Sequence, residues 1–167
     1  MWFKNLRLYQ VTEKLNTDQD QLEQALAAFK FTPCTSQEAV KMGFTSPLHP
    51  SLKQYCHQTN DVMLFAVKRQ EKVLPGSVVN EELAPKIDAM EQEKGRPLSR
   101  KEKQALKEEL IQSLLPRAFS KSSVTTALYD KQQGWLLVDT SSASRAEELL
   151  ALLRKAFGSL PAMPLLD

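Results

Sequence analysis

The segment VTTALYDKQQGWLLVD, residues 124–139, carries a clear signal for the fold. Two runs rich in apolar and β-branched residues, 124–129 and 135–139, flank a polar connection that ends in Gly134. Such runs are typical of β-strands, and a glycine just before the second run can adopt the positive φ that tight turns require. The segment therefore predicts an antiparallel β-hairpin.

The flanking sequence predicts two further strands. Residues 2–12 alternate between two faces and are rich in aromatic and branched side chains, which is typical of a strand. Residues 62–67 form a continuous apolar run that leads into Lys68 and Arg69, as expected for a buried strand that emerges into solvent. Residues 31–60 contain three prolines and Gly43, so we expect a loop there, with a helical turn near 36–41.

Two amphipathic helices are predicted outside these strands. The first spans about 18–29, after a stretch from Thr17 to Asp20 that resembles a capping box. The second follows a capping-box match from Ser144 to Glu147, carries apolar residues at helical spacing, and ends at Gly158. Residues 160–164 then leave the helix as an extended segment.

Residues 76–119 predict a pair of antiparallel helices. Pro85 lies inside the first and predicts a kink or a late start, while Gly95 and Pro97 end it. A capping box from Ser99 to Glu102 opens the second helix, and Pro116 closes it. The apolar positions are Val79, Leu83, Ile87 and Met90 in the first helix and Leu106, Leu110, Ile111 and Leu114 in the second.

This order predicts an α+β fold: a small mixed or antiparallel sheet with packed helices and an inserted helical hairpin. We expect residues 1–75 and 120–167 to form the core domain and residues 76–119 to form the inserted tip. No run approaches the roughly 18 apolar residues of a membrane span, and no signal peptide is evident. With two distant cysteines as well, the expected location is the cytoplasm.

Catalytic and metal chemistry have little support in the sequence. His49, His57, Cys34 and Cys56 match no zinc spacing, and we interpret them as solvated loop residues. Neither a nucleophile motif nor a phosphate-binding glycine loop occurs, and the paired acidic residues lie on polar helix faces. We therefore expect a protein that is not an enzyme and that uses neither a metal nor a cofactor.

The charge distribution is the feature that points to a partner. The formal net charge is +2, but residues 94–121 alone carry eight basic and three acidic side chains, a net of +5. The eight basic residues are Lys94, Arg96, Arg100, Lys101, Lys103, Lys107, Arg117 and Lys121. On a helix from Ser99, Arg100, Lys103 and Lys107 share one face, where like charges repel. A phosphate-contacting surface and a solvated helix explain this block about equally well.

Lys68, Arg69 and Lys72 precede the helical pair and extend the set of candidate DNA contacts. Phe119 is the lone aromatic residue near the basic block, so base stacking is not indicated. The expected contact is to the nucleic-acid backbone, with little readout of sequence.

Six segments carry a family resemblance. They are WFKNL (2–6), FTPC (31–34), KMG (41–43), EKVLP (71–75), LLPRAFS (114–120) and ALLRKAFGSLP (151–161). In this order they resemble the bacterial recombination-associated RdgC family. The resemblance implies a nucleoid-associated DNA-binding protein that forms a ring-like homodimer around duplex DNA and limits loading of the RecA recombinase.

Members of that family are nearly twice as long, so the resemblance also implies that a C-terminal domain is absent from this chain. The hairpin 76–119 would be the projecting tip, and Phe119 would contact a second subunit or, equally, pack beneath the hairpin. Duplex DNA is the expected ligand, with single-stranded DNA as the alternative. The rival function is a protein-interaction module whose hairpin docks a recombination or replication partner.

Overall fold

The structure is a computed structural model that describes residues 3–15 and 18–165. The predictions that fall on Trp2 and Thr17 lie outside these residues. The chain divides into two compact units: the first comprises residues up to Thr32, Met42–Arg69 and the chain from Ser123 onward, and the second comprises Pro33–Lys41 and Gln70–Ser122. The predicted domain boundaries, and the absence of a C-terminal domain, stay predictions.

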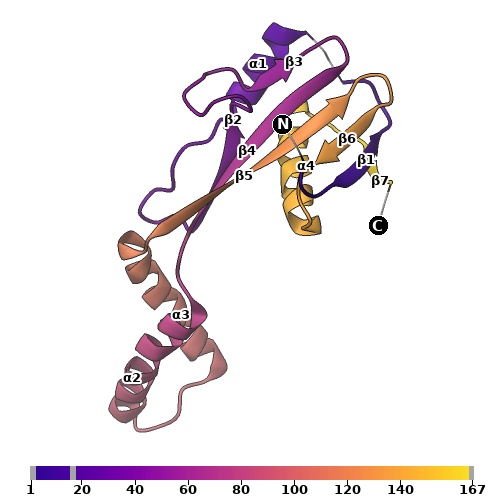
Figure 1. The fold of residues 1–167 in the computed structure, drawn as a ribbon. Helices are drawn as coiled ribbons and strands as arrows, with labels where there is room; N and C mark the ends of the chain where they lie inside the picture. Colours follow the sequence, from indigo (N-terminus) through magenta and orange to yellow (C-terminus); the bar gives the residue numbers. More distant parts are fainter. Residues whose placement is uncertain (1–2, 16–17, 166–167) are drawn as a thin grey trace. The chain divides into compact units, whose positions relative to one another are not determined.

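The strands of the described chain form one seven-stranded antiparallel sheet, which confirms the predicted α+β class. Its order is β2-β4-β5-β6-β1-β7, and β3 also pairs with β4 (Figure 1). The strands are β1 (Arg7–Val11), β2 (Val40–Thr45), β3 (Cys56–Gln58), β4 (Val62–Lys72), β5 (Ser120–Asp130), β6 (Trp135–Val138) and β7 (Ala162–Pro164).

The predicted hairpin is present as β5 and β6. Tyr129 lies opposite Leu136 in the antiparallel register. Gly134 has a φ of 71°, and its N–H donates to the Asp130 carbonyl at 2.9 Å. A residue with a side chain rarely adopts this backbone conformation, which is why glycine ends the turn.

The predicted extended segment 160–164 contains β7, which pairs with β1. Leu165 donates its N–H to the Leu8 carbonyl at 2.8 Å, and Thr12 donates to the Pro161 carbonyl at 3.0 Å. Backbone groups alternate in direction along a strand, so the nitrogen of Pro164 points away from β1, toward the outer edge of the sheet.

Helices α1 (Gln19–Ala27) and α4 (Ala143–Phe157) begin at side-chain caps. The Asp18 carboxylate caps α1 by accepting from the Gln21 N–H at 3.0 Å. The predicted start of α4 at Ser144 is wrong, because Ser142 is the cap and its Oγ accepts from the Arg145 N–H at 3.3 Å. Gly158 ends α4 with a φ of 82°, as predicted.

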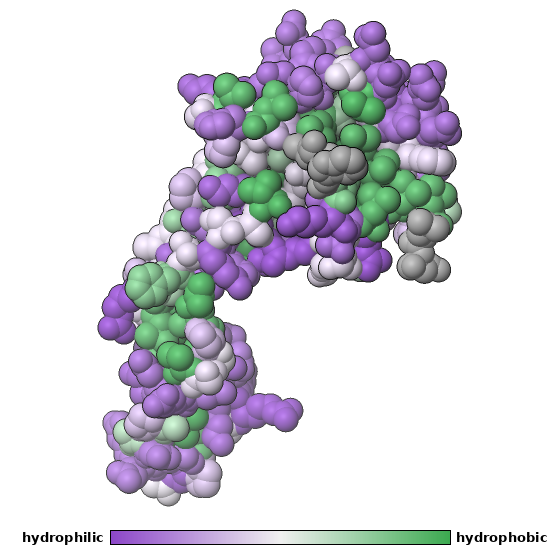
Figure 2. All heavy atoms as spheres, in the orientation of Figure 1, coloured by the Kyte–Doolittle hydropathy of each residue, from purple (hydrophilic) through white to green (hydrophobic). Residues whose placement is uncertain are grey.

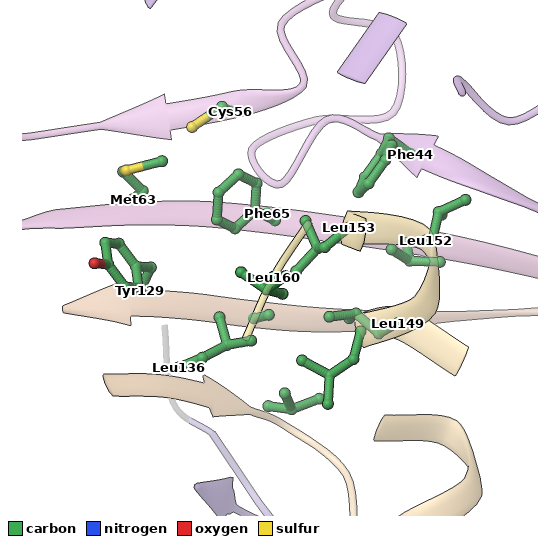
Figure 3. Close-up of a cluster of buried hydrophobic side chains, with 14 of the residues drawn as sticks. Phe44, Cys56, Met63, Phe65, Tyr129, Leu136, Leu149, Leu152, Leu153 and Leu160 are labelled. Atoms are coloured by element: carbon green, nitrogen blue, oxygen red, sulfur yellow. The ribbon is translucent and has the colours of Figure 1, made fainter. Parts of the chain in front are cut away.

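The core of the first unit lies between one face of the sheet and both of its helices. Alternate strand residues such as Phe65 and Leu136 are fully buried and meet Leu149 and Leu153 of α4 (Figure 3). Phe65 also contacts the Phe157 ring edge-on, with ring centroids 6.3 Å apart. Each large apolar side chain buried in this way stabilises the fold by about 1.5–3 kcal/mol.

The prediction of a loop over residues 31–60 is wrong, because this stretch contains β2 and β3. Phe31 donates its N–H to the Phe44 carbonyl at 2.9 Å, and Phe44 donates to the Phe29 carbonyl at 3.0 Å. The chain passes so close to Gly43 that a Cβ there would lie 2.3 Å from the Phe31 backbone. Gly43 therefore allows close backbone packing and does not mark a loop.

The predicted helical turn near 36–41 is also wrong. A hydrogen-bonded turn joins the Glu38 N–H to the Thr35 carbonyl at 3.2 Å, and β2 begins at Val40. The Glu38 carboxylate accepts from the Thr35 N–H at 2.9 Å and from Lys41 Nζ at 3.2 Å. The chain therefore makes a single turn here and continues as a strand.

In the second unit, α2 (Gly76–Lys94) and α3 (Arg100–Leu114) form the predicted helical hairpin, and the short 3-10 helix η1 (Leu115–Arg117) follows (Figure 1). Val79 and Leu83 of α2 and Leu110 and Leu114 of α3 are buried together. This core is small, so local signals matter at the helix ends. None of the described helices is long and apolar enough to cross a membrane.

The signals at the helix ends are a glycine and a serine. Gly95 ends α2 with a φ of 67°, and Ser99 caps α3 through its Oγ, which accepts from the Glu102 N–H at 3.2 Å.

Pro85 is exposed within α2, which begins at Gly76, so the predicted late start is wrong. Pro85 lacks the N–H that would bond to the Glu81 carbonyl, and a helix tolerates this best on a solvent-exposed face.

Candidate nucleic-acid interface

The basic residues of α3 form a largely exposed cationic surface in the second unit. Arg100, Lys101 and Lys103 are exposed, and Lys107 is partly buried. None of the four forms an ion pair with any residue that the structure describes. Their positive charges are therefore available to a partner.

The position of these residues on the helix follows from the α3 sequence. Arg100, Lys103 and Lys107 are spaced by three and four residues, so they lie along one side of the helix. Further along that side, Leu110 and Leu114 are buried against α2. Arg100 and Lys101 share an open patch of the α3 surface with Gln104, Ala105 and Glu108.

Glu102 binds two residues of the predicted interface. Its carboxylate accepts from Lys94 Nζ at 3.0 Å, from Arg96 Nη1 at 3.0 Å and Nη2 at 3.4 Å, and from Ser99 Oγ at 3.1 Å. The hydrogen bonds from Arg96, and next those from Lys94, lower the pKa of this carboxyl to about 2. The capping box identifies Glu102 in the sequence, but its pairing with Lys94 and Arg96 across the turn has no sequence signal.

The candidate residues of β4 do not form one surface. Lys68 and Arg69 lie in the first unit, where Lys68 Nζ sits 4.8 Å from the centre of the Phe31 ring and Arg69 Nε lies 3.2 Å from Glu148 Oε2. Since neighbouring residues of a strand point to opposite faces, Lys68 and Arg69 cannot serve the same contact.

Lys72 and Lys121 belong to the second unit. Lys72 is partly buried on β4, and its N–H donates to the Ala39 carbonyl at 2.8 Å. Lys121 is exposed on β5, with Nζ 3.4 Å from Glu71 Oε1. Surface ion pairs of this length are weak, so Lys121 can exchange Glu71 for another anion at little cost.

Phe119 is 87 % exposed. Its carbonyl accepts a hydrogen bond from the N–H of Val73, which is itself exposed, and Arg117 beside it is exposed as well. Figure 2 shows hydrophobic residues gathered where α3 ends and β5 begins, whereas the distal part of the hairpin is mostly hydrophilic on this face. The alternative that Phe119 packs beneath the hairpin is therefore wrong.

The histidines and cysteines are not all solvated loop residues. Cys56 is fully buried on β3, and burial, together with the charge of Glu23, raises the pKa of its thiol to about 12. His57 is partly buried on the same strand, whereas His49 is in a loop and its Nδ1 lies 2.7 Å from Ser51 Oγ. Cys34 is partly buried, with its N–H donating to Gln70 Oε1 at 2.7 Å.

In the described part of the chain, no three His, Cys, Asp or Glu side chains are grouped so that they could hold a metal ion. The absence of metal and cofactor chemistry stays a prediction.

Comparison with known proteins places this chain in a family. A family model described as "Putative exonuclease, RdgC" matches residues 1–166. The chain belongs to the RdgC family. This confirms the resemblance seen in the sequence, although the description of the family model names an activity that the sequence did not suggest.

Curated relatives carry the name "Recombination-associated protein RdgC". Those from Shewanella sp. (strain ANA-3) and Shewanella oneidensis are 50% identical to this chain over 165 residues, and one from Shewanella baltica is 49% identical. Each alignment covers 99% of this chain and 54% of the relative. The chain thus spans about half the length of these RdgC proteins.

Proposed function

We propose that this chain is a DNA-binding protein of recombination that contacts the sugar–phosphate backbone without sequence preference. In this proposal it is not an enzyme. It acts in the cytoplasm, on the nucleoid, in a ring-like homodimer that encircles duplex DNA and limits RecA-dependent recombination. The name of the curated relatives supports the link to recombination. The observation that supports DNA binding is the set of cations on α3 that form no ion pair with a described residue.

The energetics of α3 favour a phosphate partner. Lys103 and Lys107 are four residues apart, where two like charges destabilise a helix by about 0.2–0.5 kcal/mol. Packing does not require either charge, because the buried contacts of α3 are made by Leu110 and Leu114. Phosphates would turn this repulsion into attraction, and the release of counterions from DNA would add to affinity.

Backbone contacts fit these side chains better than base readout does. Lysine and arginine neutralise phosphates whatever the sequence, and Phe119 is the lone aromatic residue near the basic residues of the second unit. Its exposed ring suits a contact between two copies of the chain, as a ring-like dimer needs. One two-fold contact presents the same patch on both subunits, so a single ring per chain is sufficient.

The test is the double substitution Lys103→Glu and Lys107→Glu, with binding to random-sequence duplexes measured by fluorescence anisotropy. Affinity should fall equally for all sequences. If six to ten phosphates are engaged across a dimer, wild-type affinity should fall about 10³–10⁵-fold between roughly 50 and 200 mM salt. Competition with single-stranded DNA gives the strand preference.

The matched control is Lys53→Glu with Lys155→Glu, two exposed lysines of the first unit. It makes the same change in net charge and should bind DNA nearly as the wild type does. Equal binding by the α3 variant and the wild type would refute this assignment. Adding Mg²⁺ and following the length of the DNA tests separately for the exonuclease activity in the description of the family model.

The second candidate is a protein-interaction module that docks a recombination or replication partner through its helical hairpin. The exposure of Phe119 beside Val73 favours it, because exposed aromatic and aliphatic side chains often anchor protein contacts. A chain that fails to bind duplex DNA at low salt, yet binds a recombinase in pull-down, would support this candidate over the first.

A further inference from the structure

The turn between α2 and α3 holds a compact cluster of charges. Lys94 ends α2, Arg96 lies in the turn, and both reach the carboxylate of Glu102 in the first turn of α3. Both carboxylate oxygens are engaged, Oε1 by Arg96 and Ser99 and Oε2 by Lys94 and Arg96. Arg96 thus approaches the carboxylate with both terminal nitrogens of its guanidinium, the geometry that gives the strongest pairing between these groups.

The cluster divides the basic residues into two groups. Lys94 and Arg96 share one compensating carboxylate, so the cluster keeps a net charge of +1. Three cations flank Glu102 on α3 and form no ion pair with a described residue: Arg100, Lys101 and Lys103. The division therefore depends on one side chain at the start of α3.

We propose that Glu102 limits how many cations the hairpin presents to DNA, by holding Lys94 and Arg96 in a pairing that a phosphate would have to replace. This inference rests on the proposed function and deepens it: Glu102 is a positioning residue that sets the strength and salt dependence of binding. A phosphate reaching Lys94 or Arg96 must compete with a carboxylate bound through four hydrogen bonds. A phosphate that reaches Arg100 or Lys101 meets no ion pair with a described residue.

The first experiment measures the slope of log affinity against log salt for Glu102→Gln, using the random-sequence duplex. Each phosphate neutralised on duplex DNA contributes about 0.9 to this slope. Release of both cations should therefore steepen it by up to about 1.8 and tighten binding at low salt. Glu108→Gln is the matched control, because it removes the same charge from an exposed position on α3 whose hydrogen bond, at 3.3 Å, is to the uncharged Gln104.

A second variant avoids any effect of Glu102→Gln on the start of α3. Lys94→Gln with Arg96→Gln removes two positive charges but leaves Ser99 to cap the helix. If both cations are withheld from DNA, this variant keeps the wild-type slope. Arg100→Gln with Lys101→Gln, which also removes two charges, should flatten the slope by about 1.8 if each contacts a phosphate.

The outcomes distinguish the inference about Glu102 from the proposed DNA-binding function. A steeper slope for Glu102→Gln than for Glu108→Gln, with an unchanged slope for Lys94→Gln/Arg96→Gln, supports the inference. A flattened slope in the Lys94/Arg96 variant, or equal slopes for Glu102→Gln and Glu108→Gln in folded protein, overturns it and leaves the proposed function intact. A wild-type chain that binds no duplex at low salt overturns both.

Discussion

The two units of this chain are stabilised in different ways. The first encloses a large core, in which the inward residues of the strands meet two helices. The second buries Val79, Leu83, Leu110 and Leu114 at its centre and otherwise presents charged side chains. Its helices depend on Gly95 and on the Ser99 cap as well as on that small core.

This difference suggests that the first unit mainly provides stability and that the surface of the second mainly provides binding. A large core tolerates few substitutions, because removing or adding a methyl group within it disturbs the packing and changes the stability. A helical pair with a small core accepts many surface residues, so charge can collect on α3 without disturbing the packing. Substitutions in the first unit should therefore change stability, whereas most surface substitutions in the second should change binding.

The largest effect should come from Leu153→Ala in the first unit. Leu153 is fully buried, and such a truncation costs about 3–5 kcal/mol because a cavity remains. Leu83→Ala in the second unit should cost only about 2–3 kcal/mol, since Leu83 keeps 8% exposure and its surroundings can relax. Hydrogen exchange followed by mass spectrometry resolves the two units. Equal losses of protection would contradict the comparison.

Gly43→Ala should cost about 3 kcal/mol by overpacking. The added Cβ would lie 2.3 Å from the backbone nitrogen and Cα of Phe31, neither of which can move without breaking the pairing with Phe44. Gly76→Ala is the control, because a Cβ there has nothing within 4 Å. It should stabilise the second unit by about 0.4–1 kcal/mol. Urea unfolding measures both changes. If the unfolding midpoint of Gly43→Ala equals that of the wild type, the close contact between Gly43 and the Phe31 backbone is contradicted.

Phe119→Ser should weaken self-association by about 2 kcal/mol, roughly thirtyfold, and leave the melting temperature unchanged. The ring is 87 % exposed, so its loss removes little packing within the chain. Analytical ultracentrifugation and thermal melting give the two quantities. Val124→Ser, at a 57 % exposed residue of the first unit, is the control. A destabilised variant that dimerises as the wild type does would exclude the interface.

The smallest effect on binding is expected from alanine at His49, His57, Cys34 and Cys56 together. DNA affinity should be unchanged, and elemental analysis of the wild type should find no stoichiometric metal, because these side chains match no ligand spacing. Stoichiometric zinc that is lost in the variant would overturn this prediction.

Cys56 also gives a pH prediction. Its thiol has a pKa of about 12 in the fold against 9.0 in the unfolded chain, so the folded state favours the protonated form. That contribution is fully present below pH 9 and is lost as the pH rises from there toward 12. Melting temperatures measured across this range should fall less steeply for Cys56→Ala than for the wild type. Identical pH profiles of the two proteins would contradict the raised pKa of the Cys56 thiol.

The periodic parts of the fold were predictable from the sequence. The β5–β6 hairpin and the helices follow from apolar spacing and from glycine at the turns. The strand β2 was missed because Gly43 and the nearby prolines are typical of loops, while the reason for Gly43 is a backbone contact with Phe31. Such a contact joins residues that no local pattern relates.

The candidate site was predictable only in part. The basic block was visible as a run of charge, and the opposite faces of Lys68 and Arg69 follow from strand alternation. The pairing of Lys94 and Arg96 with Glu102 was not, since it spans eight and six residues across a turn. Likewise, the exposure of Phe119 depends on where the chain goes after η1, which its flanking residues do not determine.

The direction of the Pro164 nitrogen has a consequence for self-assembly. A sheet grows when an edge strand offers N–H donors and carbonyl acceptors to an added strand. On the outer side of β7, alternate residues face outward, and at Pro164 that position has no donor to offer. β7 is also only three residues long. Pro164 therefore leaves one fewer outward donor on β7, which makes this edge a poorer template for the edge-to-edge pairing that leads to fibrils.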